Sequence, residues 1–261
     1  MTSAVRNRFE LGTIHADCVT FTGAIDAIAN LVRAGAGGYV VTPNVDHVVL
    51  AEHSPELRTA YAEASLSLVD GTPLVWLSRL MRPRLPEKVS GSDLAVPLLE
   101  RAAREGWRVY FLGGAPGVGR AAADHLTRDI PGLNIVGVDA PAVGFDKDPI
   151  RERAAFDLVS NAKADLVLMA LGCPKQELLM QRWHSALALA VMLGVGATLD
   201  FLAGHVRRAP SWMSRWGMEW AYRLSQDPRR LAKRYLIRDL ALLPIVVRTW
   251  RGRGKAGDQR D

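Results

Sequence analysis

The chain has 261 residues, of which 49% are hydrophobic and 23% charged, proportions typical of a soluble protein with one large domain, alone or with an appendage. No apolar stretch of about 18 residues is free of charge, and two cysteines are too few for a disulfide framework, so integral membrane proteins and disulfide-rich secreted proteins are excluded. The net charge of +6 is uneven, since residues 204–261 hold 14 Lys and Arg against 5 Asp and Glu. We expect a cytoplasmic protein without a signal peptide, whose basic tail meets an anionic partner.

Up to about residue 203, short apolar runs alternate with helix-like stretches. In chain order the expected strands are 37–43, 66–70, 107–114, 133–138, 164–172 and 187–196, and the expected helices are 46–64, 117–129 and 175–187. The strands are almost continuously apolar, which is typical of strands buried on both faces of a parallel sheet. The alternation predicts an α/β fold with a Rossmann-like, doubly wound, mostly parallel sheet, whose ligands bind beyond the carboxyl ends of the strands.

The composition changes after Gly204, where Trp, Arg and helix formers become frequent. We therefore predict an α/β core over residues 1–203 and a basic helical appendage over 204–261, divided into short helices by Pro210, Pro228 and Pro244. The mixture of apolar and basic residues in "YLIRDLALLPIVVRTWR" is typical of a segment at a membrane surface. A solvated helix face explains most of these arginines as well, and we find no nucleic-acid-binding motif.

Two polar segments follow strands in the first half of the chain. In "LSLVDGTPLVW", Asp70 and Gly71 have the composition of a tight turn, in which glycine takes a positive φ. In "VTPNVDH", Thr42 and Asn44 follow another strand, and helix N-capping explains Asn44 without any further role. The alternative is a carboxylate and two polar side chains held at the edge of the sheet for chemistry.

The segment "FLGGAPGVG" places Gly113, Gly114 and Gly117 between a strand and a helix. Bare backbone amides at a helix N-terminus suit a phosphate or diphosphate, and a tight strand-to-helix turn is the competing interpretation. The spacing is not that of a dinucleotide fingerprint, because Pro116 interrupts it.

A third polar segment, "LGCPKQE", turns the chain at Gly172 and Pro174 and then opens a helix. Glu177 in the first helical turn complements the helix dipole, whereas Gln176 is expected at the mouth of the cleft. Cys173 has the residue type of a nucleophile, but the sequence places no histidine to activate it, so we expect a small buried or half-buried thiol.

The segment "GFDKDP" contains the Asp-x-Asp pattern with which many nucleotide-sugar enzymes hold a divalent metal. It precedes a helix-like stretch, so N-capping by Asp146 or Asp148 explains it well, and this is the favoured interpretation because a hard cation needs several more oxygen ligands from elsewhere in the chain. The six histidines show no ligand spacing. We expect no metal site and no cofactor.

Taken in order, these segments resemble the WecG/TagA/CpsF family of bacterial glycosyltransferases, from about residue 9 to residue 240. The resemblance rests on Thr42-x-Asn44, "VDGTPLVW", "GSDL", "FLGGAPGV", "PGLNIVG", "ALGCPKQE", "GVGATLDFLAG", "RRAP" and "EWAYRL..DPRR". Each fragment alone is weak, whereas their joint order and spacing are specific.

The resemblance implies an inverting, metal-independent enzyme of cell-surface polysaccharide synthesis, such as that of teichoic-acid linkage units. It would move an N-acetylmannosamine-type sugar, or a related hexose or uronic acid, from a UDP donor to a polyprenyl-diphosphate-linked sugar. In the family, the residue at Asp70 is the proposed general base, Thr42 and Asn44 line the pocket beside it, and Gln176 faces the cleft. The alternatives are an NAD(P)-dependent oxidoreductase and a non-catalytic, membrane-peripheral binder of lipid-linked sugars.

The resemblance also implies which residues meet the substrates. They are Gly71, Thr72, Gly113, Gly114, Gly117, Gly172, Pro174, Gln176, Glu177, Gly196, Asp200, Arg208, Arg223, Arg230 and Lys233. Lys233 stands where the family often has a third appendage arginine, and Arg234 follows it, so either of the two is a candidate for that phosphate contact. The appendage would complete the site and dock on the inner face of the cytoplasmic membrane, and a homo-oligomer is compatible with the sequence.

Overall fold

The computed structural model describes residues 7–204, 213, 222, 224 and 241–257. Within them a six-stranded sheet has the order β4-β3-β8-β7-β5-β6, and every neighbouring pair in it is parallel. Its strands are β3 (Gly38–Val41), β4 (Leu66–Ser67), β5 (Arg108–Gly113), β6 (Asn134–Asp139), β7 (Leu166–Ala170) and β8 (Val191–Gly194). A separate antiparallel hairpin, β1 (Arg8–Leu11) and β2 (Ile14–Asp17), precedes the sheet. The predicted α/β fold with a parallel, Rossmann-like sheet is confirmed.

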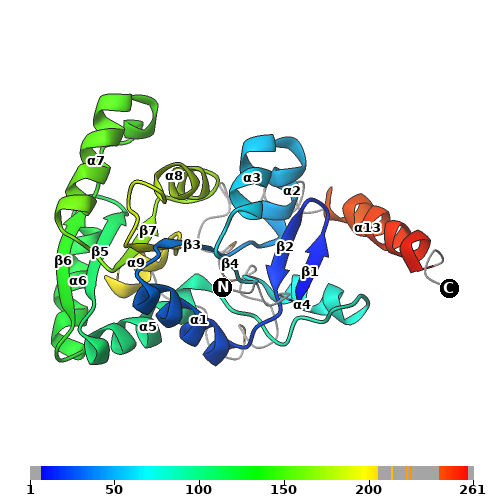
Figure 1. The fold of residues 1–261 in the computed structure, drawn as a ribbon, viewed down its shortest axis with the longest axis horizontal. Helices are drawn as coiled ribbons and strands as arrows, with labels where there is room; N and C mark the ends of the chain where they lie inside the picture. The colour runs from blue at the N-terminus through cyan, green and yellow to red at the C-terminus, as the bar shows by residue number, and fades with distance from the viewer. Residues whose placement is uncertain (1–6, 205–212, 214–221, 223, 225–240, 258–261) are drawn as a thin grey trace.

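Helices cover both faces of this sheet (Figure 1). The face that carries Leu166, Leu168 and Val191 packs against α1 (Phe21–Ala34), α5 (Gly91–Glu105), α6 (Val118–Asp129) and α9 (Thr198–Leu202). The face that carries Val167, Met169 and Met192 packs against α2 (Val45–His53), α3 (Pro55–Ala62), α4 (Thr72–Arg79), α7 (Pro149–Asn161) and α8 (Lys175–Trp183). Alternate residues of one strand thus enter two different apolar layers, which explains the continuous apolar runs in the sequence.

The helix expected over 46–64 is wrong, because the structure has two helices there. The first ends at His53, and Ser54 adopts an extended conformation that starts α3. The Ser54 hydroxyl accepts a hydrogen bond from Leu57 N at 3.1 Å, and Pro55 occupies the first helical position. Two other elements are shorter than expected, since α8 ends at Trp183 and β8 begins only at Val191.

The last helix described, α13 (Leu242–Gly257), packs against the hairpin and α2. Ile245 is buried in the same apolar cluster as the hairpin, Gly12 N donates to Thr249 Oγ1 at 3.0 Å, and Arg248 pairs with Glu52 at 2.7 Å. Pro244 lies in the first turn of this helix rather than between two helices, which is where proline is tolerated. No helix in the described ranges is both long and apolar enough to cross a membrane.

Candidate active site

The polar residues singled out from the sequence follow strands that end at one edge of the sheet (Figure 1). Thr42 and Asn44 follow β3, Asp70 follows β4, Gly113 ends β5, Gln176 follows β7 and Gly196 follows β8. The strands are parallel, so all their carboxyl ends lie on the same side, which is where ligands bind in open α/β sheets. The structure thus gathers segments that lie far apart in the sequence.

The Asp70-Gly71 turn lies beside the segment that follows β3. Asp70 N donates to Pro43 O at 2.8 Å, and a Cβ placed on Gly71 would lie 4.0 Å from Asn44 Cβ. Gly71 has φ +146°, so the glycine in this turn has a conformational reason. Asp70 is half-buried, and Thr72 directly after the turn is the first residue of α4. The turn therefore holds Asp70 at the edge of the sheet, on a backbone segment that lies against the segment that carries Asn44.

Thr42 and Asn44 both have structural partners. Thr42 is buried, and its Oγ1 donates to Gly194 O at 3.3 Å, which links the ends of β3 and β8. Asn44 Oδ1 accepts from His47 N at 3.3 Å and caps α2, so the N-capping interpretation is confirmed. The catalytic roles that the family resemblance implies for these two residues stay predictions.

The glycine-rich segment after β5 forms the tight turn that its sequence predicts. Gly113 has φ +112°, and a Cβ there would lie 2.5 Å from Ala170 O, so only glycine fits between β5 and β7. Gly114 N donates to the same carbonyl oxygen at 2.9 Å. Gly117, in contrast, is exposed, and no atom of the described residues lies within 4 Å of a Cβ placed on it. The end of this loop therefore leaves open space at the start of α6.

Three helices of eight or more residues begin at this edge without a side-chain cap among the described residues. These are α4, α6 and α8, whose capping positions are Gly71, Gly117 and Pro174. Side-chain caps are present on α1, α2, α3, α5 and α7, from Thr20, Asn44, Ser54, Ser90 and Asp148. Uncapped first-turn N–H groups and the helix dipoles together favour an anion. The edge that holds Asp70 thus also carries three helix starts whose amides suit an anion, and that of α4 is the one adjacent to Asp70 in the chain.

Gln176 and Glu177, in the first turn of α8, are buried below this edge. Gln176 is 3% exposed, rather than open at the mouth of the cleft as the sequence suggested. Its Oε1 accepts from Gly196 N at 3.2 Å, and its Nε2 donates to Glu177 Oε1 at 2.8 Å. Burial raises the pKa of Glu177, whose Oε2 has no hydrogen-bond partner among the described residues. Gln176 thus joins the segment after β7 to the segment after β8.

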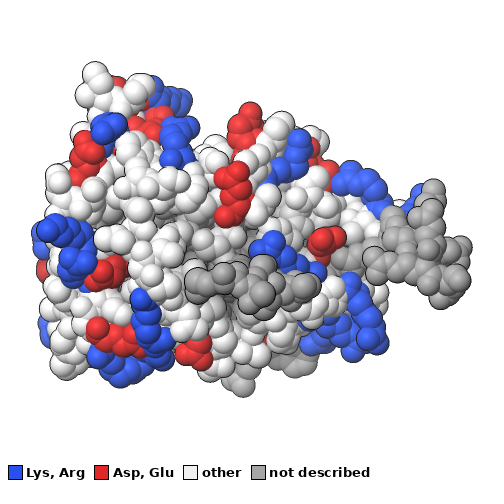
Figure 2. All heavy atoms as spheres, in the orientation of Figure 1, with Lys and Arg blue, Asp and Glu red and all other residues white. Residues whose placement is uncertain are grey.

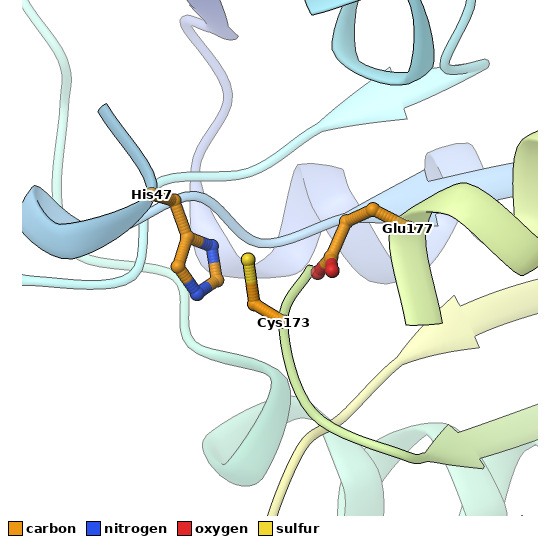
Figure 3. Close-up of side chains that lie close together, drawn as sticks. All are labelled: His47, Cys173 and Glu177. Atoms are coloured by element: carbon orange, nitrogen blue, oxygen red, sulfur yellow. The ribbon is translucent and has the colours of Figure 1, made fainter. Parts of the chain in front are cut away.

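His47, Cys173 and Glu177 come together behind these loops (Figure 3), an arrangement that the sequence did not indicate. Their ligand atoms lie within 4.8 Å of one another, although the sequence showed no sign of a histidine beside Cys173. Cys173 is a half-buried free thiol, as the sequence predicts. His47 Nδ1 lies 2.8 Å from the Tyr61 hydroxyl, and its Nε2 lies 3.4 Å from Asn44 Nδ2. A continuous buried network thus runs from Asn44 to the segment after β7.

The protonation of this network decides what it does chemically. Burial, and then the neighbouring Glu177, raise the pKa of the Cys173 thiol, which is the opposite of an activated nucleophile. Imidazole, thiolate and carboxylate are all zinc ligands, but a metal would have to displace protons from two groups whose pKa values are raised. The raised pKa values favour the neutral forms of Cys173 and Glu177, so we interpret the cluster as a hydrogen-bonded support of the loops above it.

The Asp-x-Asp segment has structural partners of its own. Asp148 Oδ1 accepts from Ile150 N at 3.0 Å and caps α7, and Asp146 pairs with Lys175 at 3.6 Å. Capping by one of the two aspartates, as the sequence predicts, is confirmed.

The remaining predicted residues divide into two groups. Gly172 and Pro174 follow β7, and Gly196 and Asp200 follow β8, so all four belong to the same edge of the sheet. Gly172 and Gly196 have φ +76° and +56°, Pro174 is exposed, and Asp200 lies in the first turn of α9. The predicted phosphate-binding residues Arg208, Arg223, Arg230 and Lys233 lie outside the described residues.

The sequence model of the glycosyl transferase WecG/TagA/CpsF family matches residues 9–256, nearly the whole chain. The chain belongs to this family. A relative from Bacillus spizizenii, named N-acetylglucosaminyldiphosphoundecaprenol N-acetyl-beta-D-mannosaminyltransferase, is 33% identical over 194 residues, which are 74% of this chain and 73% of the relative. This WecG/TagA/CpsF chain is therefore a glycosyltransferase of the hexosyltransferase class, and the oxidoreductase and the non-catalytic binder are set aside.

Proposed function

We propose that the enzyme transfers N-acetylmannosamine, or a closely related sugar, from a UDP donor to a polyprenyl-diphosphate-linked N-acetylglucosamine, with inversion and without a metal. The name of the Bacillus spizizenii relative supports the sugar and the acceptor. The single observation on which we base the mechanism is that Asp70 lies at the edge where three uncapped helices begin.

The departing UDP carries negative charge on its diphosphate, which the protein must stabilise. Amides at the starts of α6 and α8 are suited to this, because no described side chain caps these helices and the strands that precede them, β5 and β7, are neighbours in the sheet. Arg223, Arg230 and Lys233 would add cationic groups, and guanidinium groups form the stronger, bidentate contacts with phosphate. Together these donors would do the work that a divalent cation does in other nucleotide-sugar enzymes.

Asp70 is the proposed general base. The acceptor hydroxyl loses its proton as it attacks the anomeric carbon, so a carboxylate must lie within hydrogen-bond reach. The hydrogen bond from Asp70 N to Pro43 O fixes the backbone of the turn beside Thr42 and Asn44. In an inverting transfer the acceptor attacks from the side opposite UDP, so the base and the anion-binding amides would face opposite sides of the sugar.

The acceptor is a lipid, and we propose that the enzyme works as a peripheral protein on the inner face of the cytoplasmic membrane. The described part of the basic tail supports this, because Leu243, Val247 and Trp250 are exposed on α13 at the spacing of one helix face. Arg251 is exposed beside them. Apolar and basic side chains on one helix are typical of segments that lie on anionic bilayers.

The test is a transfer assay with a panel of UDP-sugars and a short-chain polyprenyl-diphosphate-N-acetylglucosamine, with products identified by mass. We expect UDP-N-acetylmannosamine to be the best donor, the product to be β-linked by carbon–proton coupling at the anomeric carbon, and EDTA to leave the rate unchanged. Transfer of a different sugar class would overturn the donor, an α-linked product would overturn inversion, and loss of activity in EDTA that Mg²⁺ restores would overturn metal independence.

A further inference from the structure

The helix that follows Asp70 and Gly71 has an exposed face of unusual composition. Helix α4 buries Leu74, Val75 and Ser78 against the core, whereas Trp76 and Leu80 at its far side are 48% and 79% exposed. Their spacing of four residues places both side chains on one face. Exposed apolar residues are ordinary when they stand singly, but this pair lies in a basic setting.

The loop after α4 adds to this face and is anchored beneath it. Met81 and Leu85 are buried, and Ser78 Oγ donates to Val75 O at 2.7 Å and accepts from Leu85 N at 3.0 Å. The loop therefore has a fixed inner side, while the arginines between the anchors stay exposed. We call the exposed residues the α4 surface: Trp76, Arg79, Leu80, Arg82 and Arg84.

The charge of this surface is one-sided. Residues 76–86 contain three arginines and no acidic residue, and the next acid, Glu87, accepts a hydrogen bond from Phe21 N at 2.8 Å. Figure 2 shows Lys and Arg side chains gathered over the end of the molecule that carries α4. The core domain as a whole is slightly acidic, so the positive charge here is local.

We propose that the α4 surface is a second membrane contact, located on the core domain and separate from the basic tail. Tryptophan favours the boundary between headgroups and acyl chains, leucine favours the acyl side, and arginine pairs with lipid phosphates. An anionic lipid leaflet matches all three, whereas an acidic protein surface would leave Trp76 and Leu80 without apolar partners. This inference rests on the proposed function. Because α4 begins directly after Gly71, the contact would bring the turn that holds Asp70 close to the leaflet that carries the lipid-linked acceptor.

The test compares the full chain with Trp76→Ser/Leu80→Ser and with a matched control, Ile150→Ser/Leu158→Ser. The control residues are 82% and 52% exposed on α7, at the opposite end of the molecule (Figure 1). Binding is measured by sedimentation with vesicles of phosphatidylglycerol and phosphatidylethanolamine, and with vesicles of phosphatidylcholine alone. Transfer is measured with a long-chain acceptor in vesicles and with a short-chain acceptor in solution.

We expect the α4 variant to lose about tenfold in binding to anionic vesicles, a loss of about 1.4 kcal/mol, and to lose transfer to the long-chain acceptor in proportion. Transfer to the soluble acceptor and all properties of the control should stay unchanged. Arg79→Gln/Arg84→Gln should weaken anionic binding by about fivefold per arginine and leave phosphatidylcholine binding as it was.

Unchanged vesicle binding by the α4 variants would overturn the proposal, and so would an equal loss with the soluble acceptor. The molecular mass of each protein in solution is also measured without vesicles. If the α4 variants form a smaller assembly than the wild type, the α4 surface is a contact with a second copy of the chain, and the membrane proposal is overturned. Should the wild-type chain transfer to neither acceptor, the proposed function fails, while the vesicle arm still decides the role of the α4 surface.

Discussion

Replacing Glu177 with glutamine tests whether burial raises the pKa of this side chain in the folded protein. The Glu177 side chain is fully buried, burial raises its pKa above the ordinary value of 4.5, and its Oε2 has no hydrogen-bond partner among the described residues. Above pH 4.5 the Glu177 carboxyl loses its proton in the unfolded chain, whereas in the folded protein it keeps the proton up to its raised pKa. Stability therefore falls as the pH rises from 4.5 to the raised pKa, by up to about 1.4 kcal/mol per pH unit.

Glu177→Gln removes this dependence while keeping the shape of the side chain and an oxygen to accept from Gln176 Nε2. We expect the variant to gain stability relative to the wild type as the pH rises above 4.5, by up to about 1.4 kcal/mol per pH unit until the raised pKa of Glu177 is reached. At this chain length a difference of about 1.4 kcal/mol corresponds to about 3 to 5 °C in melting temperature. The measurement is urea unfolding of both proteins at several pH values between about pH 5 and pH 8.

Glu105→Gln is the control. Hydrogen bonds from Arg33 and Arg101 lower the pKa of Glu105 to about 2, so it is charged in both states over the whole range. The stability difference between this variant and the wild type should not change with pH. An equally constant difference for Glu177→Gln would refute the account, because it would mean that Glu177 is charged in the folded protein.

Two further pairs of variants separate structural roles from functional ones. Asn44→Ala and Ser54→Ala each remove a helix N-cap and should each lower stability by about 1 kcal/mol in thermal unfolding, but only Asn44→Ala should lose transfer activity. Equal activity of the two variants would remove Asn44 from the site. Gly113→Ala should lower the free energy of unfolding by more than about 2 kcal/mol, because its Cβ would clash with Ala170 O. Gly117→Ala should lower it by only about 1 to 2 kcal/mol, because it adds backbone strain without a clash. Denaturant unfolding measures both variants. If they lose the same stability, the contact with Ala170 O is not the reason for glycine at position 113.

The sheet could be predicted from the sequence because strands buried on both faces are written as continuous apolar runs. The break in the helix over 46–64 was also within reach, since Ser54 followed by Pro55 is a helix start. The hairpin β1–β2 could not be predicted from the pattern of apolar residues, because each of its strands has only four residues, too few to show a repeat.

The site was predictable in its location and less so in its contacts. Asp70, Asn44 and the glycines follow strands, and parallel strands bring their ends to one edge. The network of His47, Tyr61 and Cys173 could not be inferred, because it joins side chains far apart in the chain and only packing sets their distances. For the same reason the sequence suggested an open Gln176, where the structure buries its side chain.

The most direct test of the central claim is the transfer rate of Asp70→Asn with UDP-N-acetylmannosamine and a polyprenyl-diphosphate-N-acetylglucosamine acceptor. Asp26→Asn, which alters an exposed carboxylate on α1, is the control. Loss of a general base should lower turnover by about 10² to 10⁴-fold, while the dissociation constant of the UDP-sugar stays as in the wild type. Turnover within a few fold of the wild type would contradict the assignment of Asp70 as the base.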